Sequence, residues 1–188
     1  MIKVVIAYHS GYGHTRRLAD AVREGAASLP VVAVQSLEVD KLDEKGWDAL
    51  AAADAIVFGA PTYMGGASGA FKMFADATAK VWASLGWKDK VAGGFTCSLQ
   101  MSGDKFSTLM YLVTLAMQHG MIWVGTGTMP GARAGQPDAV NRLGGWIGVM
   151  AQADNLPPEQ SPPAGDLESA RLYGRRIAEQ ARAMRRAQ

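Results

Sequence analysis

A short turn near the amino terminus holds the first residues whose types and spacing suggest chemistry. It follows an apolar run at residues 3–8 and consists of Ser10, Gly11, Tyr12, Gly13, His14 and Thr15. Glycine permits a positive φ, so the main-chain amides of such a turn can all point toward one anion. A helix predicted to follow adds its positive end. The turn therefore predicts a phosphate site, with a well-capped glycine-rich connection as an equal alternative on pattern alone.

Two further loops carry residues suited to a flat ring. Residues 55–59 are followed by Pro61, Thr62, Tyr63, Met64 and Gly65, and residues 91–96 end in Thr96, Cys97 and Ser98. Aromatic and thioether side chains lie well against a ring, while hydroxyls and amides reach polar ring edges. The two loops therefore predict a planar aromatic ligand anchored by the phosphate. The alternatives are core packing of Tyr63 and Met64 and a structural role for Cys97.

The elements that must position these loops alternate along the chain. Short β-branched runs lie at 3–8, 31–36, 55–59, 91–96 and 121–125, and segments of helical period lie at 15–27, 47–53, 68–82, 107–119 and from 166 onward. This alternation predicts βαβ units and a parallel sheet covered by helices on both faces. Ligands of such α/β sheets bind outside the carboxyl ends of the strands. The three loops are therefore expected at one edge of the sheet.

Composition limits the class of protein. The chain has 188 residues, 48% of them hydrophobic, and a formal charge of +2, which predicts one domain over 1–188 and argues against a dedicated nucleic-acid binder. No apolar run is long enough to predict a membrane span. The single Cys97 excludes an intrachain disulfide framework and a cysteine-based zinc cluster, and no metal site is predicted. We expect a cytoplasmic protein.

Two stretches depart from a simple alternating pattern. Residues 126–165 hold six prolines among glycines and polar residues, with one apolar island at 146–150. A long irregular insertion predicts a lid or an oligomer contact, with a disordered linker as the alternative. Residues 109–117 are apolar on every side of their predicted helix except at Thr114. Such a helix is either deeply buried or covered by another subunit.

Three motifs together resemble a known family. They are Ser10-Gly-Tyr-Gly-His-Thr15, Gly59-Ala-Pro-Thr-Tyr-Met-Gly65 and Gln118-His-Gly-Met121. Their order and spacing resemble the flavodoxin-fold NAD(P)H:quinone oxidoreductases of the WrbA type, and the likeness covers almost the whole chain. The resemblance implies an α/β flavodoxin-like three-layer sandwich with a five-stranded parallel sheet in the order 2-1-3-4-5. It also implies bound FMN and an oligomer, usually a tetramer.

The resemblance also implies roles for residues at matching positions. The turn from Ser10 to Thr15 would wrap the FMN phosphate, with Tyr12 also near the nicotinamide nucleotide. Thr62, Tyr63 and Met64 would contact the isoalloxazine ring, Trp82 would line the substrate side, and His119 would reach the flavin from the end of its helix. A structural role is the alternative for His119. The third loop departs from the family's Ser/Thr- and Gly-rich run, because it reads Cys97-Ser-Leu-Gln-Met-Ser-Gly103.

The expected function is therefore an FMN-dependent oxidoreductase. It would pass hydride from NADH or NADPH to a quinone by a ping-pong mechanism, and the flavin, rather than a protein side chain, would carry the redox chemistry. Tyr12, Trp82 and the island near Trp146 are candidate pocket walls in a homo-oligomer, dimer or tetramer. Two alternatives stay open: an electron carrier of the flavodoxin type, and a non-enzymatic module that binds FMN weakly or not at all.

Overall fold

The structure, a computed structural model, describes residues 1–131 and 136–186. Its sheet has the order β2-β1-β3-β5-β6, and each neighbouring pair on this path is parallel. These strands are β1 (Ile2–Tyr8), β2 (Val32–Glu38), β3 (Ala55–Tyr63), β5 (Val91–Ser98) and β6 (Ile122–Trp123). Without the short hairpin strand β4 (Gly66–Ala67), this order is the predicted 2-1-3-4-5. The flavodoxin-like α/β fold is confirmed.

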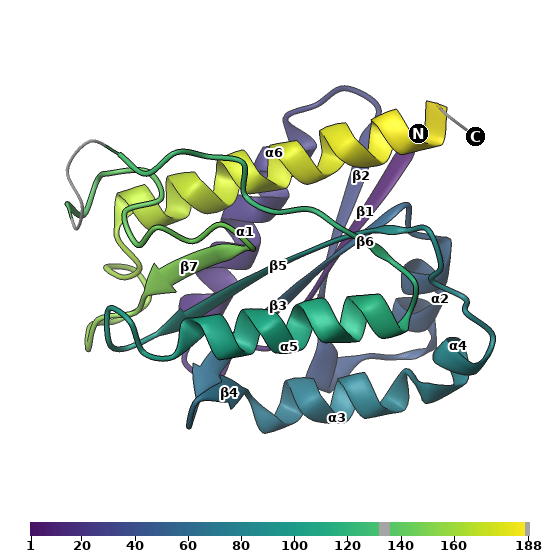
Figure 1. Ribbon diagram of the computed structural model, residues 1–188, viewed down its shortest axis with the longest axis horizontal. Helices are drawn as coiled ribbons and strands as arrows, with labels where there is room; N and C mark the ends of the chain where they lie inside the picture. Colours follow the sequence, from purple (N-terminus) through teal and green to yellow (C-terminus); the bar gives the residue numbers. More distant parts are fainter. Residues whose placement is uncertain (132–135, 187–188) are drawn as a thin grey trace.

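Helices cover both faces of the sheet (Figure 1). They are α1 (His14–Ala27), α2 (Glu44–Ala52), α3 (Gly69–Ala77), α4 (Ala79–Ala83), α5 (Lys105–Gln118) and α6 (Ala164–Arg186), and a 3-10 helix spans Val39–Lys41. The prediction of one continuous helix over 68–82 is wrong, because two helices meet at Thr78. Its hydroxyl donates to the carbonyl of Ala75 at 2.6 Å and closes the last turn of α3.

Alternation along β1 builds two cores, one on each face of the sheet. Val4 and Ile6 belong to a buried cluster with side chains of α1 and α6. Val5 and Ala7 point to the opposite face and join a cluster with side chains of α2, α3 and α5. Successive side chains of a strand point to opposite faces, so a strand buried on both faces must be apolar throughout. This explains why β1 reads as an almost continuous apolar run.

The helices α1 and α6 touch through their backbones. A Cβ atom built on Gly25 would lie 1.7 Å from the Arg171 carbonyl oxygen, and one built on Gly174 would lie 2.0 Å from that of Val22. A larger residue at either position would push the helices apart. This close packing fixes α1 against α6, and α1 begins directly after the glycine-rich turn.

The fifth strand of the predicted sheet is split into two pieces. β6 pairs with Val91 and Ala92 at the start of β5, and β7 (Val149–Gln152) pairs with the rest of β5 from Phe95 to Ser98. The predicted strand at 121–125 is therefore shorter than expected, and the prediction of an irregular segment over 126–165 missed β7. The chain leaves the sheet after β6 and returns to it as β7, so the residues after β7 reach the carboxyl edge of the sheet.

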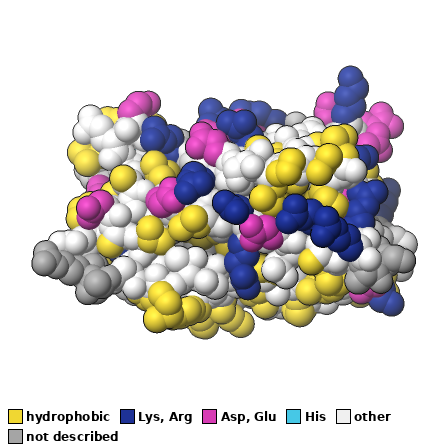
Figure 2. Space-filling model, turned by 90° about the horizontal axis from the view of Figure 1, so that it is seen from above, with side chains coloured by type: hydrophobic (Ala, Val, Ile, Leu, Met, Phe, Trp, Pro, Cys, Tyr) yellow, Lys and Arg dark blue, Asp and Glu magenta, His cyan; other side chains and the backbone are white. Residues whose placement is uncertain are grey.

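The outer face of α6 is a mixed charged surface (Figure 2). Several of its arginines are paired with carboxylates, as in Arg171–Glu168 and Arg175–Glu179. The basic end of the chain therefore forms a solvated face with interspersed acidic groups. Among residues 1–131 and 136–186, no helix is long and apolar enough to cross a bilayer.

Candidate functional site

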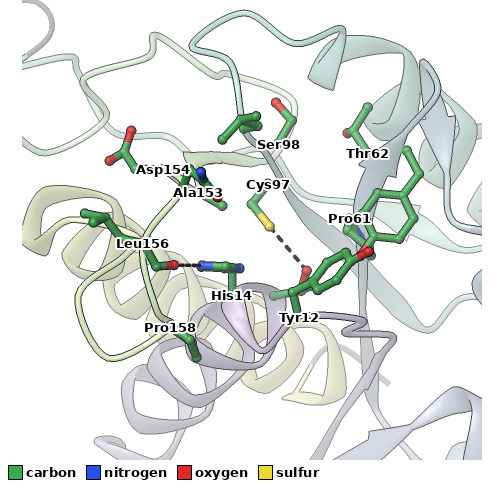
Figure 3. A pocket seen from close by; sticks show the side chains of 14 residues that line it. Tyr12, His14, Pro61, Thr62, Cys97, Ser98, Ala153, Asp154, Leu156 and Pro158 are labelled. Carbon is green, nitrogen blue, oxygen red and sulfur yellow. Dashed lines mark hydrogen bonds between the residues drawn. The ribbon is translucent and has the colours of Figure 1, made fainter.

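A cavity of about 490 Å³ lies where the carboxyl ends of β1, β3 and β5 meet (Figure 3). The three loops that the sequence predicts all reach it. The predicted residues among its lining are Tyr12, His14, Thr15, Pro61, Thr62, Tyr63, Cys97 and Ser98. The remaining lining residues are Leu99 and a late segment of Ala153, Asp154, Asn155, Leu156 and Pro158. The fold thus brings together segments that lie up to 146 positions apart in the sequence, from Tyr12 to Pro158.

The first loop leaves main-chain donors at the start of α1. The Ser10 hydroxyl oxygen accepts from the amides of Gly13 and Arg16, each at 3.1 Å. Gly13 has a φ of 90° and begins α1 without a side-chain cap. The amides of His14 and Thr15 have no acceptor among the described residues. The loop therefore offers free N–H groups at the positive end of a helix, which favours an anion.

The late segment packs onto this loop. The His14 Nε2 donates to the Leu156 carbonyl oxygen at 2.9 Å, so the other ring nitrogen, Nδ1, is unprotonated in the neutral tautomer. A Cβ atom on Gly13 would lie 2.9 Å from Pro158. Position 13 therefore requires glycine for two reasons: the φ is positive, and Pro158 leaves no room for a Cβ atom. These contacts join the first loop to the segment after β7, 142 positions further along the chain, and together they form one wall of the cavity.

The second loop ends β3 and turns back as β4. The Thr62 hydroxyl lies 2.8 Å from those of both Thr96 and Thr108, so three buried hydroxyls anchor the end of β3 to β5 and α5. Tyr63 meets Tyr12 edge to face, with ring centroids 6.2 Å apart. Pro61, Thr62 and Tyr63 line the cavity. The loop therefore supplies a rigid wall of the cavity, because the Thr62 hydroxyl is used in hydrogen bonds that hold the loop in place.

The floor of the cavity joins the first and third loops. The Cys97 sulfur lies 3.2 Å from the Thr15 hydroxyl (Figure 3). Burial raises the pKa of the Cys97 thiol to about 11, and the Thr15 hydroxyl opposes this shift only in part. The thiol is therefore neutral at physiological pH. A neutral, buried thiol is a small apolar surface rather than a nucleophile.

A buried lysine holds the third loop, a feature that the sequence analysis did not predict. Lys105 opens α5 and is 1% exposed. Its ammonium donates to the carbonyl oxygens of Gln100 at 2.6 Å, Met101 at 2.8 Å and Ser102 at 3.3 Å. Three carbonyls satisfy the three N–H donors of a lysine. The loop that follows β5 is therefore wrapped around a positive charge.

A second buried charge cluster ties the late segment to the fold. The Asp166 carboxylate accepts from Arg142 Nε at 2.8 Å, from Arg142 Nη2 at 3.0 Å and from the Gln152 amide at 2.9 Å. Arg142 and Asp166 are both buried. One carboxylate thus connects residue 142, β7 and the first turn of α6. This pair anchors the segment that lines the cavity after β7.

Several predicted residues lie outside the cavity. Ser10, Gly11 and Gly13 shape the first loop without lining it, and Thr96 lies buried behind Thr62. Met64 and Gly65 form the tip of the β3–β4 hairpin with φ values of 47° and 80°, and the Met64 side chain is fully exposed. The Ser107 hydroxyl holds this tip by donating to the Gly65 carbonyl.

His119 and Trp82 lie at the other end of α5. They are therefore far from the cavity of their own chain. His119 follows α5, about 20 Å along the helix from Lys105. The Thr78 hydroxyl donates its hydrogen to Ala75, so His119 Nε2 must donate to Thr78 Oγ1 at 2.8 Å. Burial lowers the pKa of this imidazole, and its Nδ1 has no partner among the described residues. Trp82 is half exposed beside it.

The comparisons with known proteins agree with this geometry. Residues 2–136 match the model of a family described as NADPH-dependent FMN reductase. The chain belongs to this family. A solved structure of a flavodoxin, WrbA-like protein from Agrobacterium tumefaciens is 47% identical in sequence, has a TM-score of 0.78, and matches 97% of this chain and 99% of its own. The predicted WrbA-type relationship is thus confirmed.

Two curated relatives carry different functional names. Flavodoxin FldP of Pseudomonas aeruginosa is 45% identical over 95% of this chain and 96% of its own length. An NAD(P)H dehydrogenase (quinone) of Geobacter sulfurreducens is 33% identical over 95% of this chain and 97% of its own length. A flavodoxin from the domain Archaea, at 20% identity and a TM-score of 0.65, shares the fold. Together these findings support an FMN-dependent oxidoreductase.

Proposed function

We propose that the protein binds FMN in this cavity and passes hydride from NADH or NADPH to a quinone-like acceptor by a ping-pong mechanism. The observation that carries the proposal is the set of free amides of His14 and Thr15 beside a cavity of about 490 Å³. A phosphate suits the amides, and a flat ring suits the walls beyond them. Cavities of roughly 300–1,000 Å³ are typical of small-molecule sites.

The residues of the first loop fit a phosphomonoester without a lysine. Each charge-assisted hydrogen bond from a main-chain amide contributes about 1.5–3 kcal/mol to binding. The Ser10 hydroxyl uses its lone pairs on the amides of Gly13 and Arg16, which leaves its own hydrogen for an anion. We assign the phosphate to the turn from Ser10 to Thr15, as the sequence predicts.

The second and third loops fit a flat ring. Pro61 and Tyr63 present a rigid wall, Cys97 presents a neutral surface, and Ser98 presents a hydroxyl. Bound FMN supplies two-electron redox chemistry, so no acid or base of the protein is required. The residues bind and orient the ring, exclude water from its covered face and leave the other face for a second ligand. Thr62, Met64 and Gly65 contribute through the main chain of the hairpin.

Donor and acceptor are proposed to use the same open face in turn. The cavity serves as the single place for both, which is the basis of the ping-pong order. Tyr12 is 76% exposed at the rim, which supports the proposal that it contacts a nicotinamide nucleotide. The reduced Cys97 and the use of a nicotinamide nucleotide fit the cytoplasm, which is the compartment that we propose.

A homo-oligomer, dimer or tetramer, would complete the site. The outer side of α5 exposes Phe106, Met110 and Met117, while Leu109 and Leu112 of the same helix are buried. Large apolar side chains gathered on one helix favour a covered face. Trp82, half exposed at the far end of this helix, would serve the cavity of a neighbouring subunit, and the buried His119 beside it would support that wall rather than contact the flavin of its own chain.

An electron carrier of the flavodoxin type is the second candidate. The 45% identical relative named flavodoxin FldP favours it. Such a carrier would bind FMN in the same cavity and give electrons to a protein instead of a quinone. Flavodoxin-type carriers use acidic surfaces to reach basic partners, whereas this chain has a formal charge of +2.

The assay that tests the proposal is steady consumption of NADH or NADPH with benzoquinone by the FMN-loaded protein. We expect many turnovers per flavin, and parallel lines in double-reciprocal plots as both substrates vary. Full flavin loading without turnover would favour the carrier. A control variant of the assay is Gly69→Ala, which places a methyl group in open space on α3. It is expected to keep full activity.

A further inference from the structure

Lys105 differs from the lysines expected at a helix start. Lysine is almost never fully buried unless its charge is satisfied, and here burial occurs in the first turn of a helix, where the helix dipole disfavours a cation. The structure satisfies this charge with three carbonyls of one loop. A positive charge in such a place is costly for folding, so its position calls for a second role.

The loop connects this charge to the cavity wall through one oxygen. The Gln100 carbonyl oxygen accepts from Lys105 Nζ at 2.6 Å and from the Ser98 hydroxyl at 3.0 Å. Ser98 lines the cavity. A hydroxyl has a single hydrogen, and that of Ser98 is directed at Gln100. Toward a ligand in the cavity, Ser98 can therefore only accept a hydrogen bond.

We propose that Lys105 is a positioning residue for the flavin site: its ammonium fixes the loop after β5 and thereby sets Ser98 as a hydrogen-bond acceptor toward the bound ring. This inference rests on the proposed function. It assigns a role to a residue that does not line the cavity, and it explains how a loop with the bulky residues Leu99, Gln100 and Met101 keeps one shape beside it.

Protonation of Lys105 connects this role to pH. Burial lowers the pKa of Lys105 to about 8, with Cys97 and Asp166 opposing the shift and Arg142 adding to it. These three groups belong to β5, α6 and the segment before β7. A neutral amine has two N–H groups for three carbonyls and no charge to attract them. The loop is therefore held less tightly above pH 8.

Lys90 provides a matched control at the opposite edge of the sheet. Its ammonium also donates to three carbonyl oxygens, those of Ala51 and Ala53 at 2.6 Å and that of Leu50 at 3.4 Å. These carbonyls close α2, far from the cavity. Lys90→Met and Lys105→Met remove the same set of interactions from two places, and only one of these places borders the cavity.

The test is a fluorescence titration of each protein with FMN at pH 7, 8 and 9, where the phosphate, with a second pKa of about 6, is already a dianion. We expect Lys105→Met to weaken FMN binding at least tenfold at pH 7 and Lys90→Met to change it less than twofold. Wild-type affinity is expected to fall about tenfold from pH 7 to pH 9, while that of Lys105→Met stays flat.

Ser98→Ala, a change near the surface, supports the test if Lys105→Met does not fold. It is expected to weaken FMN binding and to reduce its pH dependence. A pH-independent wild-type affinity, or equal binding by wild type and Lys105→Met, would overturn the inference while the proposed function stands. Absence of FMN binding by the wild type would overturn the proposed function first, and this inference with it.

Discussion

The two edges of the sheet use the same kind of hydrogen bond, from a lysine ammonium to main-chain carbonyls, for different purposes. At the amino edge, Lys90 closes α2, and Arg185 of α6 donates to the Met1 carbonyl and the Asp54 carboxylate. At the carboxyl edge, Lys105 holds a loop, while the amides of His14 and Thr15 have no acceptor among the described residues. Polar groups are thus saturated where the fold needs stability and left available where a ligand is expected. A lysine bonded to three carbonyls therefore indicates a site only where these carbonyls belong to a loop that borders a cavity.

The largest effect is expected at Gly13, which belongs to the carboxyl edge alone. Gly13→Ala places a methyl group at a φ of 90° and 2.9 Å from Pro158. The strain, on the order of 1–3 kcal/mol, combines with this clash to turn the loop away. We expect FMN affinity to fall more than about 100-fold in a fluorescence titration. Gly69→Ala is the control, and an unchanged affinity in Gly13→Ala would show that the loop does not hold the phosphate.

The next effect concerns stability and separates the two roles of Lys105. Its pKa is lowered in the folded protein from 10.5 to about 8, so between these values the unfolded chain binds more protons. The stability contributed by this group therefore rises with pH in that window and is lost as pH falls through about 8. In urea unfolding, the free energy of unfolding of the wild type should rise by on the order of 2–3 kcal/mol relative to that of Lys105→Met between pH 7.5 and 10.

This pH trend has the opposite sign to the one expected for FMN affinity. A lysine that only stabilised the fold would change the free energy of unfolding with pH and leave the FMN affinity of the folded protein unchanged. If the stability difference between wild type and Lys105→Met does not change with pH, Lys105 is not desolvated as the structure indicates, and the comparison of the two lysines loses its basis.

Ser10→Ala is expected to act more weakly on the first turn. It removes the oxygen that accepts from the amides of Gly13 and Arg16, together with the hydroxyl hydrogen proposed to bind the phosphate. We expect about a tenfold loss of FMN affinity, the equivalent of one hydrogen bond of about 1.4 kcal/mol. Binding of riboflavin, which has no phosphate, should be unaffected, and an equal loss for both ligands would contradict a phosphate role for Ser10.

Lys90→Met is expected to have the smallest effect, and on stability alone. Loss of a cation at the carboxyl end of α2 costs about 1 kcal/mol in the free energy of unfolding. The midpoint of urea unfolding should shift accordingly while the FMN dissociation constant stays within twofold. A large loss of FMN affinity here would mean that the two edges are coupled, and the contrast between them would fail.

The fold was largely predictable from the sequence because its signals are local. The runs at 3–8, 55–59 and 121–125 are nearly continuous apolar stretches, which predicts parallel strands covered by helices on both faces. The split of the last strand was not predictable, because β6 has two residues and β7 follows only after a long irregular stretch. The apolar island at 146–150 was its only signal, and strand-length islands in loops are ambiguous.

The site was predicted in part. Small residues after each strand marked the loops that reach the cavity, because the carboxyl ends of parallel strands share one edge. Leu156 and Pro158 were missed, since their position depends on where β7 joins the sheet. Lys105 was missed for a physical reason: a lysine in a first helical turn normally faces water, and only the course of the third loop reveals its three partners.

The central claim is that the amides between Ser10 and Thr15 hold a phosphate and so fix a flat ring in the cavity. The most direct measurement is a side-by-side titration of the wild-type protein with FMN and riboflavin, followed by absorbance. We predict one FMN per chain and at least about 100-fold weaker binding of riboflavin, as expected for two amide–phosphate bonds. Equal affinity for the two ligands, or binding of neither, would contradict the account.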